Sequence, residues 1–219
     1  MNEPTEVHDM STTPTTTVHS AVYDAFADWE VGFATAYLAN GNWQRDPGSF
    51  RVVTVGLTKG PVTSMGGLRI IPDVTLDELS AADSAMLVLP GADAYVTGEL
   101  APFARKAREF VEAGTPVAAI CGATFGLARE GLLDDRRHTS NAPEFLQASG
   151  YAGAALYQDA PAVTDGDLIT GSGVRPVEFA REVMAKLEAY EPKVLDAWYR
   201  LYSEGDPAAY VELEGSGAA

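Results

Sequence analysis

Cys121 is the only cysteine in the 219-residue sequence, and its surroundings favour a chemical role. The segment Ala119-Ile120-Cys121-Gly122-Ala123 has small residues two positions before and two positions after the thiol. This is the steric requirement of a nucleophile elbow, a sharp turn between a strand and a helix that exposes the side chain. The dipole and free N–H groups of the following helix favour a thiolate and can hold an oxyanion. The alternative is a buried cysteine that acts as a small hydrophobic residue.

An elbow needs a strand before the thiol and a helix after it, and the sequence predicts both. Residues 115–121 are an apolar run typical of a strand buried on both faces, and a short helix follows and ends at Gly131. Further strands are predicted at 18–26, 51–57 and 85–91. They alternate with amphipathic helical segments, which predicts an α/β fold with a parallel sheet covered on both faces.

The charge and composition exclude several kinds of partner. With 31 acidic and 15 basic residues the formal charge is −16, which argues against nucleic acid or an anionic membrane as a partner. A single cysteine cannot form an internal disulfide or a CxxC metal or redox site. The sequence shows no secretory signal and no apolar run of the roughly 20 residues needed to span a bilayer. We therefore expect a cytoplasmic protein.

The two ends of the chain differ from its body. Residues 1–16 are rich in threonine, proline and acidic residues, which predicts a disordered tail. Residues 17–190 are predicted to form the domain, and 191–219 a helical extension with apolar residues at helical spacing. This extension is expected to pack either on the body of its own chain or on a second subunit.

Three segments, YDAFADWE, LVLPGAD and AICGATFGLAREGLL, together resemble the ThiJ/PfpI superfamily, whose fold is that of the class I glutamine amidotransferase domain. The resemblance spans about residues 18–187. It implies a three-layer α/β/α sandwich with a mostly parallel, flavodoxin-like sheet, helices on both faces and a nucleophile elbow. It also implies a protein that usually forms homodimers and needs neither cofactor nor metal.

The resemblance also implies roles for single residues. Cys121 matches the nucleophile, and Glu30 matches the acidic residue that lies against the thiol and relays a proton. The N–H groups of Gly91 and Gly122 match the oxyanion pocket. Other residues expected to line the pocket are Trp29, Ala92, Asp93 and Phe125.

The histidine of the family's site has no obvious counterpart. Gly122 follows the thiol directly, so the adjacent histidine found in family peptidases is absent. In the later segment RRHTSNAPEF, His138 lies near the expected place, but Asn141 matches the position before the proline better. Either His138 acts as the base, or the site uses Cys121 and Glu30 with Asn141 as a polar contact.

Two functions remain open. The first is a hydrolase or lyase in which a Cys121 thiolate attacks a small electrophile, such as a glyoxal, a glycated adduct or an isonitrile. The second is a redox or stress sensor without catalysis, in which Cys121 is oxidised and Glu30 binds the product. A binding domain that keeps the fold without chemistry is a weaker third possibility.

Overall fold

The centre of the protein is a seven-stranded sheet in the order β5-β2-β1-β6-β7-β9-β8. The computed structural model describes residues 16–216, so the tail predicted over residues 1–16 lies outside them except for Thr16, which begins the first strand. All neighbouring strands are parallel except β8 and β9, which form an antiparallel hairpin. The strands are β1 (Thr16–Ala21), β2 (Phe50–Gly56), β5 (Val74–Thr75), β6 (Met86–Leu89), β7 (Val117–Ile120), β8 (Ala162–Asp165) and β9 (Leu168–Gly171).

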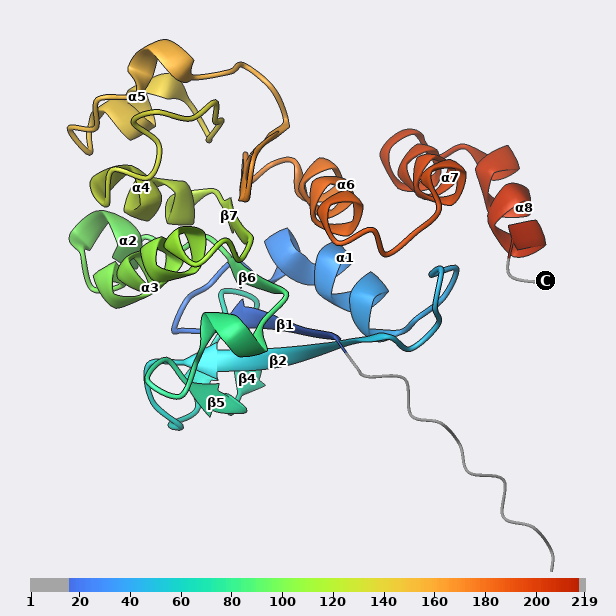
Figure 1. Ribbon diagram of the computed structural model, residues 1–219, viewed down its shortest axis with the longest axis horizontal. Coiled ribbons are helices and arrows are strands. Elements are labelled where there is room, and N and C mark those ends of the chain that lie inside the picture. Colours follow the sequence, from blue (N-terminus) through green and yellow to red (C-terminus); the bar gives the residue numbers. More distant parts are fainter. Residues whose placement is uncertain (1–15, 217–219) are drawn as a thin grey trace, which may run out of the picture.

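Helices cover both faces of the sheet, which gives the predicted three-layer α/β/α sandwich (Figure 1). On one face lie α1 (Asp28–Ala39) and α6 (Pro176–Lys186), with α7 (Pro192–Glu204) packed on both of them and α8 (Pro207–Ser216) packed on α7. On the other lie α3 (Ala101–Glu112) and α4 (Gly122–Arg129), with α2 (Ala94–Thr97) and α5 (Pro143–Gln147) packed on α4. Two short 3-10 turns, η1 (Ala81–Asp83) and η2 (Ala154–Leu156), complete the helical elements of the described residues.

Two hydrophobic cores lie on the two faces of the sheet, and the apolar side chains of the central strands contribute to both. In β6, Met86 and Val88 enter the core under α1 and α6, whereas Leu87 and Leu89 enter the core under α3 and α4. Successive strand side chains point to opposite faces, so a strand buried on both sides must be apolar throughout. This explains why β6 and β7 read as continuous apolar runs rather than as alternating ones.

Two antiparallel strand pairs accompany the parallel strands. The strands β3 (Val62–Thr63) and β4 (Arg69–Ile70) pair antiparallel as a small separate sheet. The turn between β8 and β9 contains Gly166, at φ +59°, a conformation that glycine adopts without strain.

The C-terminal helices pack on their own chain. Trp198 of α7 is fully buried and contacts Phe33 and Tyr37 of α1 through edge-to-face aromatic pairs. Ala209 and Leu213 of α8 are buried in the same core. Of the two packing arrangements open from the sequence, the described residues therefore show the one in which α7 and α8 complete the core of the domain.

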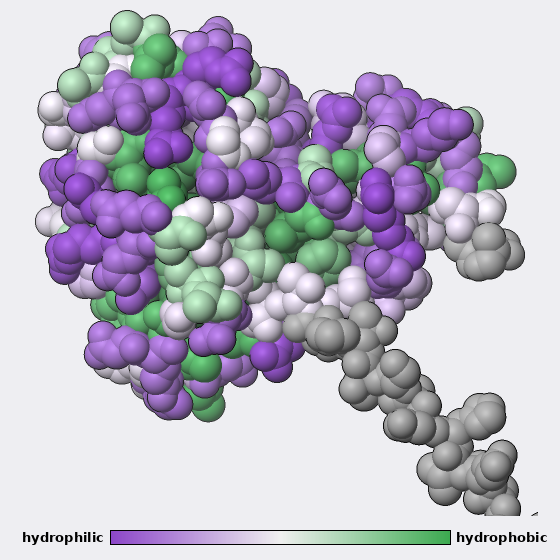
Figure 2. Space-filling model, in the orientation of Figure 1, coloured by the Kyte–Doolittle hydropathy of each residue, from purple (hydrophilic) through white to green (hydrophobic). Residues whose placement is uncertain are grey.

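The surface is mainly hydrophilic on the face drawn in Figure 2, where apolar residues show between hydrophilic ones in smaller groups. Two exposed apolar side chains, Trp29 and Val174, lie beside the loops that follow β1 and β9. Within residues 16–216, no helix is long and apolar enough to cross a membrane.

The chain order of the strands creates a place for a site. From β1 the chain crosses to β2 on one side and later returns to β6 on the other side of β1. The loops at the carboxyl ends of β1 and β6 therefore diverge, and open α/β sheets bind ligands at such a crevice. The loops after β7 and β9 lie next to it in the sheet order.

Candidate active site at the carboxyl ends of the strands

Cys121 lies in a strained turn between β7 and α4, as the elbow pattern predicts. Its backbone has φ +57° and ψ −124°, a conformation that residues with a Cβ rarely adopt. The turn is held by the Cys121 N–H, which donates to the Gly171 carbonyl at 2.9 Å. Gly122 has no room for a side chain, because a Cβ there would lie 2.6 Å from the Ala92 carbonyl oxygen. The small residue after the thiol thus permits close contact with the loop after β6.

Glu30 of α1 lies against the thiol. Its side chain is almost fully buried, at 2% exposure, and its carboxyl lies close to the Cys121 thiol, since both pack on Gly91 and Gly173. Carboxylate Oε2 also accepts a hydrogen bond of 2.6 Å from the Gly91 N–H. A Cβ on Gly91 would come within 2.7 Å of Oε2 and 2.9 Å of Cys121 Sγ, so only glycine allows this approach.

Asn141, rather than His138, completes the surroundings of the thiol. Its Nδ2 donates to Cys121 Sγ at 3.2 Å, and its Oδ1 accepts from the Gly173 N–H at 2.9 Å. Gly173 is a site residue that the sequence analysis missed. A Cβ there would lie 2.7 Å from Glu30 Oε1 and 2.8 Å from Sγ. The glycines at 171 and 173, just after a predicted strand, were the signal that could have identified it.

Of the two arrangements that the sequence left open, the structure shows the one with Asn141 at the thiol, and His138 bonds other partners. His138 is fully buried, and its ring nitrogens bond the Arg136 carbonyl at 2.7 Å and the Tyr151 hydroxyl at 3.0 Å. Both nitrogens therefore have partners away from Cys121. Burial also lowers the pKa of His138, so it is held neutral.

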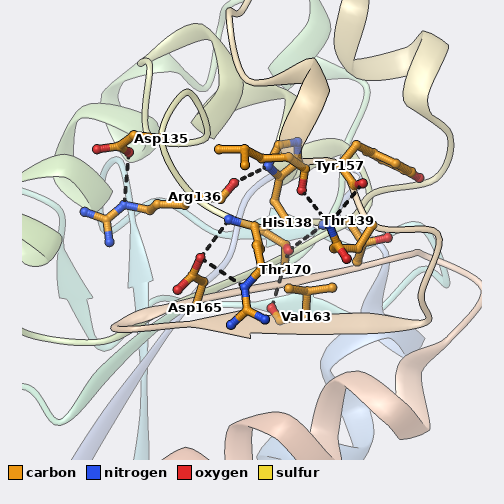
Figure 3. Close-up of polar contacts among 11 residues, drawn as sticks. Asp135, Arg136, His138, Thr139, Tyr157, Val163, Asp165 and Thr170 are labelled. Atoms are coloured by element: carbon orange, nitrogen blue, oxygen red, sulfur yellow. Dashed lines mark hydrogen bonds and ion pairs between the residues drawn. The ribbon is translucent and has the colours of Figure 1, made fainter.

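The segment of His138 instead fixes the loop that carries Asn141. The Thr139 N–H donates to the Thr170 hydroxyl at 2.9 Å, and the His138 carbonyl accepts from the Gln158 N–H at 2.7 Å (Figure 3). The Arg137 backbone N–H donates to the Asp165 carboxylate of β8 at 2.7 Å, and its guanidinium lies 3.6 Å from the same carboxylate. These contacts tie residues 137–139 to β8 and β9, and Asn141 follows two residues later.

The protonation of the site differs from the sequence prediction of a thiolate. Burial and the neighbouring Glu30 carboxyl raise the pKa of the Cys121 thiol to about 11, although Asn141 Nδ2 and the Gly122 N–H act in the opposite direction. Burial raises the pKa of Glu30 as well, against the hydrogen bonds from Cys121 and Gly91. Two adjacent buried acids cannot both ionise easily, so the pair shares one proton near neutral pH. The free site therefore contains a thiol that has its proton acceptor beside it.

The oxyanion donors also need correction. Gly91 belongs to the site, but its N–H is already bonded to Glu30 and is not free for a substrate oxygen. The next residue, Ala92, is buried against Gly122, and its N–H has no acceptor among residues 16–216. The backbones of Ala92 and Gly122 lie close together beside Cys121.

A cavity of about 460 Å³ opens at the thiol. Its lining residues come from four parts of the chain: Trp29, Glu30, Cys121, Asn141, Ser172, Gly173, Val174 and Pro176. Trp29 is 49% exposed and forms part of the wall, in agreement with the expectation. Phe125 does not line this cavity, because it is buried between Phe145 and the Arg129 guanidinium. Asp93 is exposed, outside the lining residues.

The described residues give no indication of a metal centre. Within residues 16–216, no three His, Cys, Asp or Glu side chains come close enough together to hold an ion. The polar atoms around Sγ are one carboxyl, one amide and backbone N–H groups, which suit proton transfer and anion binding.

Similar proteins share this fold over most of their length. A Bacillus subtilis protein named uncharacterized protease YoaZ is 40% identical over 199 residues, which cover 90% of this chain and 95% of that protein. The crystal structure of a thiJ/pfpI family protein from Bacillus anthracis matches with a TM-score of 0.88 and 37% identity, covering 95% of this chain and all of the other. The DJ-1 superfamily protein Atu0886 from Agrobacterium tumefaciens matches with a TM-score of 0.77 and 34% identity, covering 88% of this chain and all of that one.

The match to a family model agrees with these relatives. The model of the DJ-1/PfpI family matches residues 16–186, from the first residue of β1 to the last residue of α6. The matched region contains the elbow, Glu30, Asn141 and both glycines that pack on the thiol. The chain belongs to the DJ-1/PfpI family, that is, to the ThiJ/PfpI superfamily.

Proposed function

We propose that this chain is a cysteine-dependent hydrolase or lyase that acts on small electrophiles, with Cys121 as the nucleophile. The observation that carries this proposal is the arrangement at Sγ, where the Asn141 amide donates to the sulfur and the buried Glu30 carboxyl lies beside it at an open cavity. A buried structural cysteine would not require a strained backbone, a buried carboxyl and two glycines packed on the sulfur.

The first step we propose is addition of the thiol to a polarised carbon. The sulfur forms a bond to the substrate carbon while its proton passes to the Glu30 carboxylate, whose pKa is raised by burial. The electron pair of the carbonyl moves to its oxygen, which the Gly122 and Ala92 N–H groups then stabilise. In hydrolysis, neutral Glu30 gives this proton to the leaving group as the bond between that group and the carbon breaks, which leaves a thioester on Cys121. Water then adds to the thioester carbon and gives a proton to Glu30. The carbon–sulfur bond breaks last, and Glu30 returns the proton to the sulfur.

The cavity favours neutral substrates with an apolar part. Trp29, Val174 and Pro176 supply an apolar wall, and none of the lining residues carries a positive charge. A carboxylate or phosphate would therefore enter this cavity without a cationic partner and at a cost in desolvation. We expect an uncharged carbonyl compound or an isonitrile to react faster than an anionic analogue of the same size.

Turnover of a panel of electrophiles tests the proposal. Methylglyoxal, an alkyl isonitrile and a neutral ester are incubated with the wild type, with Cys121→Ser and with Glu30→Gln. A matched control is Glu178→Gln, because Glu178 also lies in the first turn of a helix but pairs with Arg175 instead of the thiol. We expect loss of turnover in the first two variants and not in the control. Equal rates in the wild type and Cys121→Ser for every compound would refute the proposal.

Peptide hydrolysis is a second candidate, because the similar Bacillus subtilis protein is named an uncharacterized protease. The geometry gives it less support, since both ring nitrogens of His138 are bonded away from the thiol. A peptide leaving group needs a proton from an acid, and Glu30 would have to supply it. Including unfolded casein in the same panel separates the two candidates.

Redox sensing remains an alternative use of Cys121. A thiol with a pKa of about 11 is mostly protonated at neutral pH, whereas oxidation requires the thiolate. This protonation disfavours the sensor function. If Cys121 is nevertheless a sensor, dilute peroxide should rapidly add two oxygens to it, measured by intact mass. Slow oxidation together with turnover of an electrophile would favour the enzyme.

We also propose that the chain is cytoplasmic and forms a homodimer, as its family membership implies. Light scattering on the full chain tests the dimer through the mass in solution. A mass equal to that of one chain over a wide concentration range would contradict it.

A further inference from the structure

A buried tyrosine is connected to the site through the loop after β6. Tyr23 follows β1, is 4% exposed, and its hydroxyl donates to the Pro90 carbonyl. It also lies 3.2 Å from the Tyr95 hydroxyl. A phenol has a single proton to donate, and Tyr23 donates it to the Pro90 carbonyl oxygen. The Tyr95 hydroxyl is therefore the donor in its bond with the Tyr23 oxygen. Neither tyrosine has a part in the proposed reaction.

One peptide group joins this tyrosine pair to the site. The Pro90 carbonyl and the Gly91 N–H belong to the same peptide, and the Gly91 N–H donates to Glu30 Oε2 at 2.6 Å. The peptide dipole therefore has a donor at its oxygen and an anion acceptor at its hydrogen. A donor on a carbonyl polarises the peptide and strengthens the bond made by its N–H. The chain of bonds runs from Tyr95 through Tyr23 and the peptide to Glu30.

We propose that Tyr23 is a positioning residue for the Cys121 site, which sets how the proton is divided between Glu30 and the thiol by polarising the Pro90–Gly91 peptide. The inference deepens the proposed function, since it concerns the same nucleophile. Tyr23 can act in this way over a wide pH range, because burial raises its pKa well above the usual value and keeps the hydroxyl protonated.

The direction in which Tyr23 shifts the thiolate fraction follows from the two protonation forms of the Cys121–Glu30 pair. After losing one proton, the pair is either a thiol beside a carboxylate or a thiolate beside a neutral carboxyl. The Gly91 N–H stabilises the carboxylate and hence the first form. Removing the Tyr23 hydroxyl weakens that bond, which increases the fraction of thiolate.

Few other titratable groups complicate this balance. The lining residues from the loop after β9 and the start of α6 are Ser172, Gly173, Val174 and Pro176, none of which titrates. From the loop after α4 the contact is the neutral amide of Asn141. Among the residues that line the cavity, Cys121 is therefore the titratable neighbour of Glu30, and Tyr23 acts on Glu30 through the Pro90–Gly91 peptide.

Alkylation of Cys121 by iodoacetamide, measured as a function of pH, tests the inference. For Tyr23→Phe we expect alkylation about two- to fourfold faster at neutral pH, with the midpoint of the acidic limb about 0.3–0.6 pH unit higher, the size expected for partial weakening of a charged hydrogen bond. At pH values below the limb the rates should coincide, because both sites are then fully protonated. Tyr95→Phe should give a smaller shift in the same direction.

The matched control is Tyr190→Phe. Tyr190 is equally buried, at 3% exposure, and its hydroxyl donates to the Tyr37 carbonyl on the other side of the sheet. Loosening of the fold would accelerate alkylation at every pH and leave the midpoint unchanged, in this variant as in Tyr23→Phe. A Tyr23→Phe profile that overlays the wild type, or that rises equally at all pH values, would overturn the inference. If Tyr23→Phe does not fold, the Tyr95→Phe profile decides in the same way. Alkylation needs no turnover, so this inference and the proposed function can fail separately.

Discussion

The Cys121→Gly variant should have a larger free energy of unfolding than the Cys121→Ala variant. The backbone at this residue has φ +57° and ψ −124°, far from the ψ of about +47° of the left-handed helical region. Alanine keeps the Cβ and therefore keeps the strain, whereas glycine adopts the same angles freely. Both variants lack the thiol, so the loss of its bonds to Glu30 and Asn141 cancels in the comparison.

The size of the difference follows from three contributions. Backbone strain of this kind costs about 1–3 kcal/mol, and the position of ψ places Cys121 near the upper end, about 3 kcal/mol. Glycine loses about 1 kcal/mol more than alanine through the entropy of the unfolded chain. The lost burial of one carbon removes at most about 0.8 kcal/mol. The remainder, about 1 kcal/mol in favour of glycine, corresponds to about 2–4 °C in Tm for a chain of this size.

Thermal and urea unfolding of the two purified variants measure this difference directly. Circular dichroism at several scan rates shows whether the transition is reversible, and the urea midpoints give the free energies of unfolding. We expect the order Cys121→Gly above Cys121→Ala. If the alanine variant is as stable as the glycine variant, the elbow is not strained and the reasoning is refuted.

Three further predictions concern residues around the thiol. Gly173→Ala places a methyl 2.7 Å from Glu30 Oε1 and should lower turnover by at least about tenfold, whereas Gly32→Ala, with no atom within 4 Å, should leave steady-state rates unchanged. Asn141→Leu removes a donor to the sulfur and should raise the thiol pKa, measured by ultraviolet absorbance of the thiolate; an unchanged titration would contradict this role. Glu30→Gln should be more stable than the wild type at pH 7. Burial raises the pKa of Glu30 in the folded state above 4.5, so the wild type loses stability as pH rises through that pKa and the carboxyl ionises. The glutamine amide does not ionise and avoids this loss. The gain should vanish below about pH 4.5 in urea unfolding, and a gain that persists there would exclude ionisation as its cause.

Much of the fold was predictable because burial on both faces leaves a plain pattern. The apolar runs that become β6 and β7, and the glycine after the thiol, identified the sheet and the elbow. Glu30 and Cys121 are separated by 91 positions, and only the resemblance to known proteins brought them together. Local patterns cannot do so, since the contact depends on the order of the strands.

The side-chain positions and the protonation state that the sequence did not reveal depend on contacts between distant parts of the chain. Asn141 replaces His138 at the thiol because Thr170 and the loop near residue 158 fix the path of the chain. Phe125 faces Phe145, which belongs to a helix whose packing the sequence does not reveal. The helix N-terminus after Cys121 favours a thiolate, but burial beside a carboxyl outweighs it.

The lone thiol also gives a means of following how this protein folds. Its partners, at positions 30, 91, 141 and 173, span most of the chain, and none is a close neighbour in sequence. Contacts between residues so far apart form late, because long loops must close before them. Pulse labelling of this single cysteine during refolding would therefore report when the whole sheet has assembled, without any added probe.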